Sequence, residues 1–123
     1  MRTNLIAGAL LLGAAAPASA MNVATFLMKA EAVNKKGPLA LFSGDLKLLT
    51  NQVKADAAAI RAERLAAEAA RKRPNHCPPA GGVKLSDKDV LAAMEAVPPT
   101  LRAQTNTKNA LSAYLARRFP CAR

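Results

Sequence analysis

The chain has 123 residues, the length of one small domain, and a formal net charge of +10. It contains three Phe, one Tyr and no Trp, and much of its apolar content is alanine, which excludes a core built on aromatic rings. A strongly basic chain favours nucleic acid, an anionic membrane or cell-wall surface, or an acidic protein as its partner. Charge alone defines no site, so an inert basic surface fits the same composition.

The first twenty residues have the pattern of a secretory signal peptide. Arg2 precedes an apolar run over residues 5–16, and Pro17 breaks this run before the small residues 18–20. The run is shorter than the roughly 20 residues that a membrane-spanning helix needs. We therefore expect cleavage after Ala20, a mature chain of residues 21–123 that forms a single helical domain, and a periplasmic location. Export argues against nucleic acid as the natural partner.

The spacing of apolar residues predicts two helices in the first half of the mature chain. Asn22 is the expected cap of a helix that ends near Lys35, with apolar residues at three- and four-residue intervals along one face. Residues 38–42 are a short apolar connector, which we expect to form at most one helical turn and to pack into the core. Ser43 is the expected cap of a long helix over residues 44–72.

The long helix carries a basic outer face. Its apolar stripe thins into alanine along the helix, so we expect the second half to pack closely or to be partly exposed. A basic face of this density can bind an acidic partner or an anionic envelope surface, although a solvated face without a partner is the commoner reason for such a pattern. The candidate partner-binding residues are Lys54, Arg61, Arg64, Arg71 and Lys72.

The segment from Cys77 to Cys121 predicts a closed pair of helices. A second, antiparallel helix returns the chain to its starting point, so a cysteine before the first helix and one after the last can meet. An exported chain with two cysteines has one intramolecular pairing available. In the chain-entropy account, closing a loop of this length stabilises the fold by about 4 kcal/mol.

Both helices of this segment have clear boundary signals. Ser86 is the expected cap of the first helix, with Asp89 at the reciprocal position of a capping box, and Pro98 ends that helix. Thr105 or Asn106 is the expected cap of the second. We see no strand-like alternation and no repeat, and we predict an all-α, four-helix-like domain with one long central helix and a disulfide-closed C-terminal helical hairpin.

No group of residues favours catalysis. His76 has no acid beside it in the sequence, and a Cys–His pair needs a free thiolate. A zinc site needs three or four ligands, and His76, Cys77 and Cys121 provide three at best. Asp87 and Asp89 are better explained by helix capping than by acid–base chemistry. We therefore predict no enzyme activity, no metal and no cofactor.

Four short motifs mark the C-terminal half, all within residues 76–121: Cys77-Pro78-Pro79, Leu85-Ser86-Asp87, Val97-Pro98-Pro99 and Phe119-Pro120-Cys121. As a set they resemble the Tai/Rap family of periplasmic immunity proteins. These small helical, exported proteins protect bacteria against peptidoglycan amidases that type VI secretion delivers. The resemblance implies a protein that occludes a secreted amidase, with Cys77 and Cys121 as its disulfide. The Ala/Arg-rich run over residues 57–73 differs from the family pattern, so no binding residue is carried over from it.

A second hypothesis comes from a different class of protein. An envelope stress or chaperone-like structural protein would use the long basic helix to bind unfolded chains or anionic surfaces. That hypothesis predicts weak, salt-sensitive and promiscuous binding, whereas an immunity-type protein predicts a specific one-to-one complex.

Overall fold

The computed structural model describes residues 20–122, and the all-α prediction is confirmed for this range. No strand occurs among these residues, and an isolated backbone bridge joins Asn22 to Asn106. The predicted signal peptide lies outside the described residues, apart from Ala20. The elements are the α-helices α1 (Val23–Lys35), α2 (Gly44–Ala69), α3 (Asp87–Glu95) and α4 (Thr107–Arg118), and the 3₁₀ helices η1 (Gly37–Phe42) and η2 (Pro99–Leu101).

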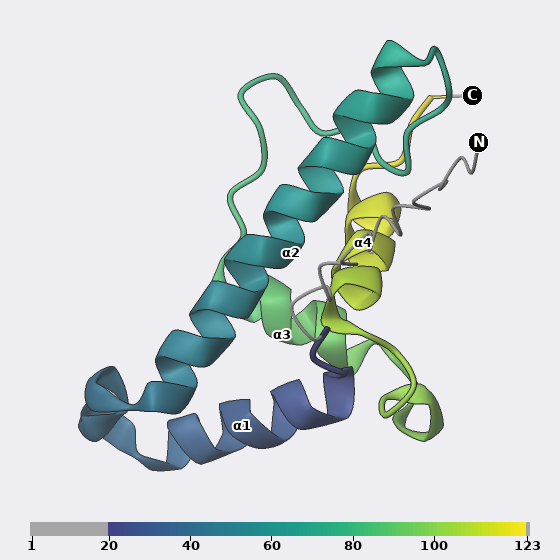
Figure 1. Cartoon of the computed structure of the whole chain (residues 1–123). Helices are drawn as coiled ribbons and strands as arrows, with labels where there is room; N and C mark the ends of the chain where they lie inside the picture. Colours follow the sequence, from purple (N-terminus) through teal and green to yellow (C-terminus); the bar gives the residue numbers. More distant parts are fainter. Residues whose placement is uncertain (1–19, 123) are drawn as a thin grey trace, which may run out of the picture.

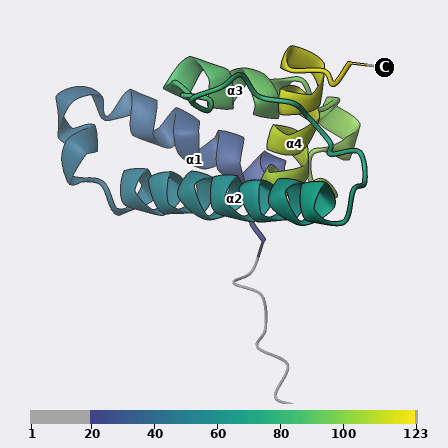
Figure 2. The ribbon, with the colours of Figure 1, turned by 90° about the horizontal axis from the view of Figure 1, so that it is seen from above.

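The long helix α2 organises the arrangement of the others. Figure 1 shows α1 and α2 diverging from η1 like the arms of a V, and α4 closing the open side. Seen from above, α1 lies between α2 and α3 (Figure 2). Both views show α4 crossing α3 rather than lying alongside it.

Apolar residues from all four α-helices form two neighbouring buried clusters. Leu85, just before α3, packs against both of them, so the clusters are joined. The buried members come from the apolar faces that the helical spacing predicts, and Met94 and Leu111 are fully inaccessible to solvent. The first cluster contains Val23, Phe26, Leu49, Val90, Met94 and Ala110, and the second contains Ile60, Ala93, Leu111 and Leu115.

One buried polar contact holds α2 against α4. The Thr107 hydroxyl donates a hydrogen bond of 2.6 Å to Asp56 Oδ2, and the Gln52 amide donates one of 2.9 Å to Asp56 Oδ1. Thr107 and Asp56 are both buried. Because a buried carboxylate needs hydrogen-bond donors, this pairing favours one position of α4 along α2.

The helix caps that the sequence predicts are present. Asn22 accepts from the Thr25 N–H at 2.8 Å, and Ser43 accepts from the Asp45 N–H at 3.2 Å. Asn106, rather than Thr105, caps α4. The caps therefore fix where the helices begin, because each side-chain oxygen satisfies a backbone donor in the first helical turn.

The predicted end of the long helix was wrong. The helix ends at Ala69 and not at residue 72, because Arg71 adopts the left-handed conformation with φ 55°. The Arg71 N–H donates to the Glu68 carbonyl at 3.0 Å, and the Lys72 N–H donates to the Ala67 carbonyl at 2.8 Å. This pair of bonds is a Schellman motif, which usually has glycine at the left-handed position. Arginine rather than glycine holds this position, so no local signal predicts where the helix ends.

The connector between the first two helices forms more helix than expected, because η1 spans six residues, or about two 3₁₀ turns. The expectation that it packs into the core is wrong. Leu39, Leu41 and Phe42 are 69%, 80% and 88% exposed. η1 lies at the outer corner where the chain passes from α1 into α2 (Figure 1), and these three side chains are exposed there. Gly37, with φ 54°, allows this turn of the chain.

The predicted disulfide is present. Cys77 and Cys121, which are 44 residues apart, are bonded, with their Cα atoms 4.9 Å apart. The Cys77 N–H also donates to the Phe119 carbonyl at 2.8 Å. Irregular chain over residues 78–86 separates Cys77 from α3, so the disulfide ties the end of α4 to the segment that leaves α2.

Candidate partner-binding surface

Three of the five predicted basic residues share one strip of α2. Lys54 and Arg61 are seven residues apart, and Arg64 follows after three more, so the three side chains lie on one face of the helix. We call these three residues the basic strip. Arg71 and Lys72 are exposed but lie beyond the end of α2, so the structure does not place them on the strip.

The C-terminal half of α2 borders a hollow of about 550 Å³, which we call the His76 hollow. Its lining is part apolar and part polar, and the charged residues in it are the two arginines of the basic strip. The lining residues are Ala57, Ile60, Arg61, Arg64, His76, Pro78, Gly81, Gly82, Val83, Leu85 and Leu115.

His76 is the buried polar residue of this hollow. It is 4% exposed, and its Nδ1 has no hydrogen-bond partner among the described residues. Burial lowers the pKa of His76 below its ordinary value, and the nearby charge of Arg64 lowers it further. Both effects favour the neutral imidazole, and its Nδ1 can form a hydrogen bond with a group that enters the hollow.

The N-terminal half of α2 borders a second, larger hollow of about 920 Å³, which we call the apolar groove. It lies between α1, α2 and α3, and Lys54 of the basic strip lines it. Its rim carries both signs of charge, since Glu31, Asp87 and Glu95 also line it. Its apolar lining is formed by Phe26, Leu27, Ala30, Val33, Leu46, Leu49, Val53, Leu85, Val90 and Leu91.

The two hollows form one candidate surface. Leu85 lines both of them, and α2 forms a wall of each. Arg64 pairs with Glu68 at 3.2 Å, whereas Arg61 forms no ion pair among the described residues and is exposed. This arrangement can hold apolar side chains of a partner in the groove and an acidic group beside Arg61.

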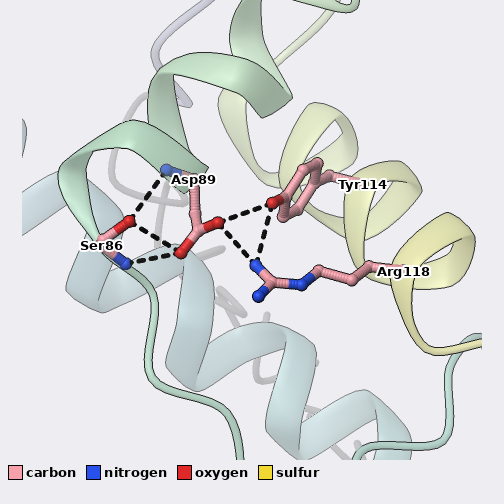
Figure 3. A network of polar contacts seen from close by, with 4 residues as sticks. All are labelled: Ser86, Asp89, Tyr114 and Arg118. Atoms are coloured by element: carbon pink, nitrogen blue, oxygen red, sulfur yellow. Dashed lines mark hydrogen bonds and ion pairs between the residues drawn. The ribbon is translucent and has the colours of Figure 1, made fainter.

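A polar network outside the hollows fixes α3 to α4 (Figure 3). Asp89 completes the predicted capping box, in which its carboxylate accepts from the Ser86 N–H at 2.9 Å. The same carboxylate accepts from the Tyr114 hydroxyl at 2.7 Å and from Arg118 at 2.5 Å. The Ser86 N–H, followed by Tyr114, lowers the pKa of Asp89 well below its ordinary value.

The sequence predicted only the capping part of this network. Tyr114 and Arg118 are four residues apart and share a face of α4, which is the one local signal that they could act together. Nothing in the sequence indicates that this face meets Asp89, because the contact depends on how α4 crosses α3. Asp89 therefore has a structural role, as the capping interpretation implies.

The described residues contain no other group with evident chemistry. Both cysteines are in the disulfide, and residues 20–122 contain no cluster of three or more His, Cys, Asp or Glu side chains that could hold a metal ion. In the same range, none of the helices combines the length and the apolar character needed to cross a bilayer.

Comparison of the chain with protein-family models, with curated proteins and with solved structures finds no match. The resemblance to the Tai/Rap immunity family therefore stays a prediction that depends on the motifs in residues 76–121.

Proposed function

We propose that the chain is an exported, periplasmic and non-enzymatic protein that binds a protein partner and covers that partner's functional surface. The observation that carries the proposal is the position of the basic strip, whose residues line two apolar hollows that share Leu85. Apolar contacts supply affinity, and the arginines select a partner with an acidic segment and speed the encounter.

The resemblance over residues 76–121 supports a secreted peptidoglycan amidase as the partner and immunity as the role. The disulfide supports an oxidising compartment such as the periplasm. A binding surface that the disulfide holds in place before the encounter loses less conformational entropy on binding than a flexible one. The disulfide thus allows a protein with a small core to present a rigid surface that can cover its partner.

The proposal is tested by capturing partners from an envelope extract with the oxidised protein, and by measuring the affinity for the purified partner. Because Arg61 is exposed beside the His76 hollow, we expect Arg61→Glu to weaken binding by about tenfold or more. Arg117→Glu is the matched control, since it changes the net charge equally on an exposed part of α4 that lines neither hollow. Equal losses with both variants would contradict the proposed surface.

Salt dependence separates this proposal from the stress or chaperone-like alternative. A specific one-to-one complex that survives moderate salt supports occlusion. Weak binding to many proteins that disappears as salt rises supports the alternative, because exposed charges are screened over about 8–10 Å at such ionic strengths. The variant with both Cys77 and Cys121 replaced by Ser tests whether rigidity matters. If its affinity for the partner is unchanged, the disulfide does not contribute to binding.

A further inference from the structure

The 3₁₀ helix η1 presents three large apolar side chains together at one corner of the molecule. Leu39, Leu41 and Phe42 are each more than two-thirds exposed, and we call them the apolar tip. Single exposed apolar residues are ordinary. Here three large ones fall within four successive residues, which concentrates exposed apolar surface in one short helix. Figure 1 shows η1 at the junction of α1 and α2, and Figure 2 shows the same turn at one end of the molecule.

The tip does not serve the core. None of its three side chains belongs to either buried cluster or packs against one. η1 has no side-chain cap at its N-terminus, where Pro38 takes an early position. The exposed side chains therefore have no structural explanation within the described residues.

Positive charge surrounds the tip. Lys35 and Lys36 precede it, Lys47 follows it on the first turn of α2, and all three are exposed. The segment over residues 29–47 has four lysines and two acidic residues, so its formal net charge is +2. Both acids are paired, Glu31 with Lys35 at 3.1 Å and Asp45 with Lys29 at 3.2 Å, so the uncompensated charge near the tip is positive.

We propose that the apolar tip is a membrane-contact site, which inserts into the interfacial region of a bilayer that contains anionic lipids. The three apolar side chains enter the boundary between headgroups and acyl chains. Lys36 and Lys47, which form no ion pair among the described residues, extend to the lipid phosphates. Three side chains are too few for firm anchoring without charge, so the site requires anionic lipid. The tip lies outside both hollows, so this contact is independent of the proposed partner binding.

Charge complementarity favours a bilayer over a second copy of the chain. Two tips facing each other would bring like-charged lysines together. A stable protein interface also buries about 800 Å² on each partner, which is more than three side chains provide. An anionic bilayer satisfies both the apolar side chains and the lysines.

The chain contains no tryptophan, so Phe42→Trp places a single fluorescent reporter on the tip. We expect its emission to shift to shorter wavelength with vesicles of phosphatidylglycerol and phosphatidylcholine, and to stay constant with phosphatidylcholine alone. Leu101→Trp is the matched control, because Leu101 is an exposed apolar residue on η2, away from the tip. Its emission should stay constant with both kinds of vesicle.

A second pair of variants measures the contribution of the side chains. The double variant Leu41→Ser and Phe42→Ser should lower partitioning into the anionic vesicles by about tenfold or more, given the apolar area that these side chains remove from water. Leu65→Ser, at an exposed position on α2, should leave partitioning within about twofold of the original. Helical circular dichroism should be unchanged in both variants, since neither site belongs to a buried cluster.

Three results would each overturn the proposal. Vesicle binding without a shift at residue 42 would mean that charge alone holds the protein on the surface. A shift that appears without vesicles and grows with protein concentration would mean that the tip joins two copies of the chain. Absence of binding to the anionic vesicles would exclude a membrane role for the tip.

Discussion

At the C-terminal end of α2 the chain is held by a disulfide and by hydrogen bonds between distant residues, whereas at its N-terminal end η1 presents apolar side chains to solvent. Arg73 donates to the Cys121 carbonyl at 3.0 Å, and Asn75 donates to the Ser112 carbonyl at 2.9 Å. No contact of this kind fixes Leu41 or Phe42. In a chain with few aromatic residues, these restraints stabilise one end of the molecule, whereas the other end exposes apolar side chains.

The largest expected effect comes from removing the restraint at the C-terminal end. Replacing both Cys77 and Cys121 by Ser should lower the free energy of unfolding by about 4 kcal/mol, because the unfolded chain regains the entropy of a 44-residue loop. Urea unfolding of the variant and of the reduced protein measures this loss. Leu41→Ser, at the other end of α2, should change the stability by less than about 0.5 kcal/mol. A similar loss of stability from the double cysteine variant and from Leu41→Ser would contradict the difference between the two ends of α2.

The second largest effect should come from the buried contact between α2 and α4. Thr107→Val keeps the shape of the side chain but leaves one oxygen of the buried Asp56 without its donor, which should cost about 2 kcal/mol. Thermal unfolding measures the change. Thr50→Val is the control, since the Thr50 hydroxyl bonds only the Leu46 carbonyl in its own helix and is exposed. If Thr107→Val and Thr50→Val lose the same stability, the buried contact does not hold α2 against α4.

A substitution at the C-terminal end of α2 should stabilise the protein slightly. Arg71→Gly should raise the free energy of unfolding by about 0.5 kcal/mol, because glycine adopts a positive φ without the steric cost that arginine has. Urea unfolding again gives the value. Lys72→Gly is the matched control, because Lys72 has no positive φ and gains nothing from glycine. A loss of stability with Arg71→Gly would contradict the Schellman geometry.

The sequence predicted most of the fold, because the helix starts and the disulfide have local or countable signals. Asn22, Ser43 and Ser86 are caps whose side-chain chemistry acts within one turn. Two cysteines leave a single intramolecular pairing. The exposure of Leu39, Leu41 and Phe42 on η1 could not be predicted, because an apolar run has the same sequence whether or not a neighbouring helix covers it.

The candidate site was predicted only in part. Helical spacing places Lys54, Arg61 and Arg64 on one strip, but it cannot show that hollows open beside them. Those hollows depend on where the irregular segment 78–86 passes α2, and that path has no periodic signal. The role of Arg118 beside Asp89 was missed for a related reason, since 29 residues separate them.

The smallest expected effect is a pH dependence that arises at His76, the only histidine in the chain. Its pKa in the folded state lies below 6.5, so the unfolded chain binds the proton more readily. The stabilisation is complete above about pH 6.5 and is lost as the pH falls below that value towards the folded-state pKa. Unfolding free energies measured from pH 8 to pH 5 should therefore decrease, and His76→Leu should remove this slope. A slope that persists in the variant would assign the effect to other groups.

We infer that the disulfide-held end of the molecule is a stable scaffold for the basic strip, and that η1 is not part of this scaffold. Hydrogen exchange of the oxidised and reduced protein, followed by mass spectrometry, tests this claim directly, because exchange reports local opening. We expect strong protection in α4 and in the second half of α2, weak protection in η1, and a loss of protection on reduction that is largest at the disulfide-held end. Equal protection at both ends of α2, unchanged by reduction, would contradict the claim.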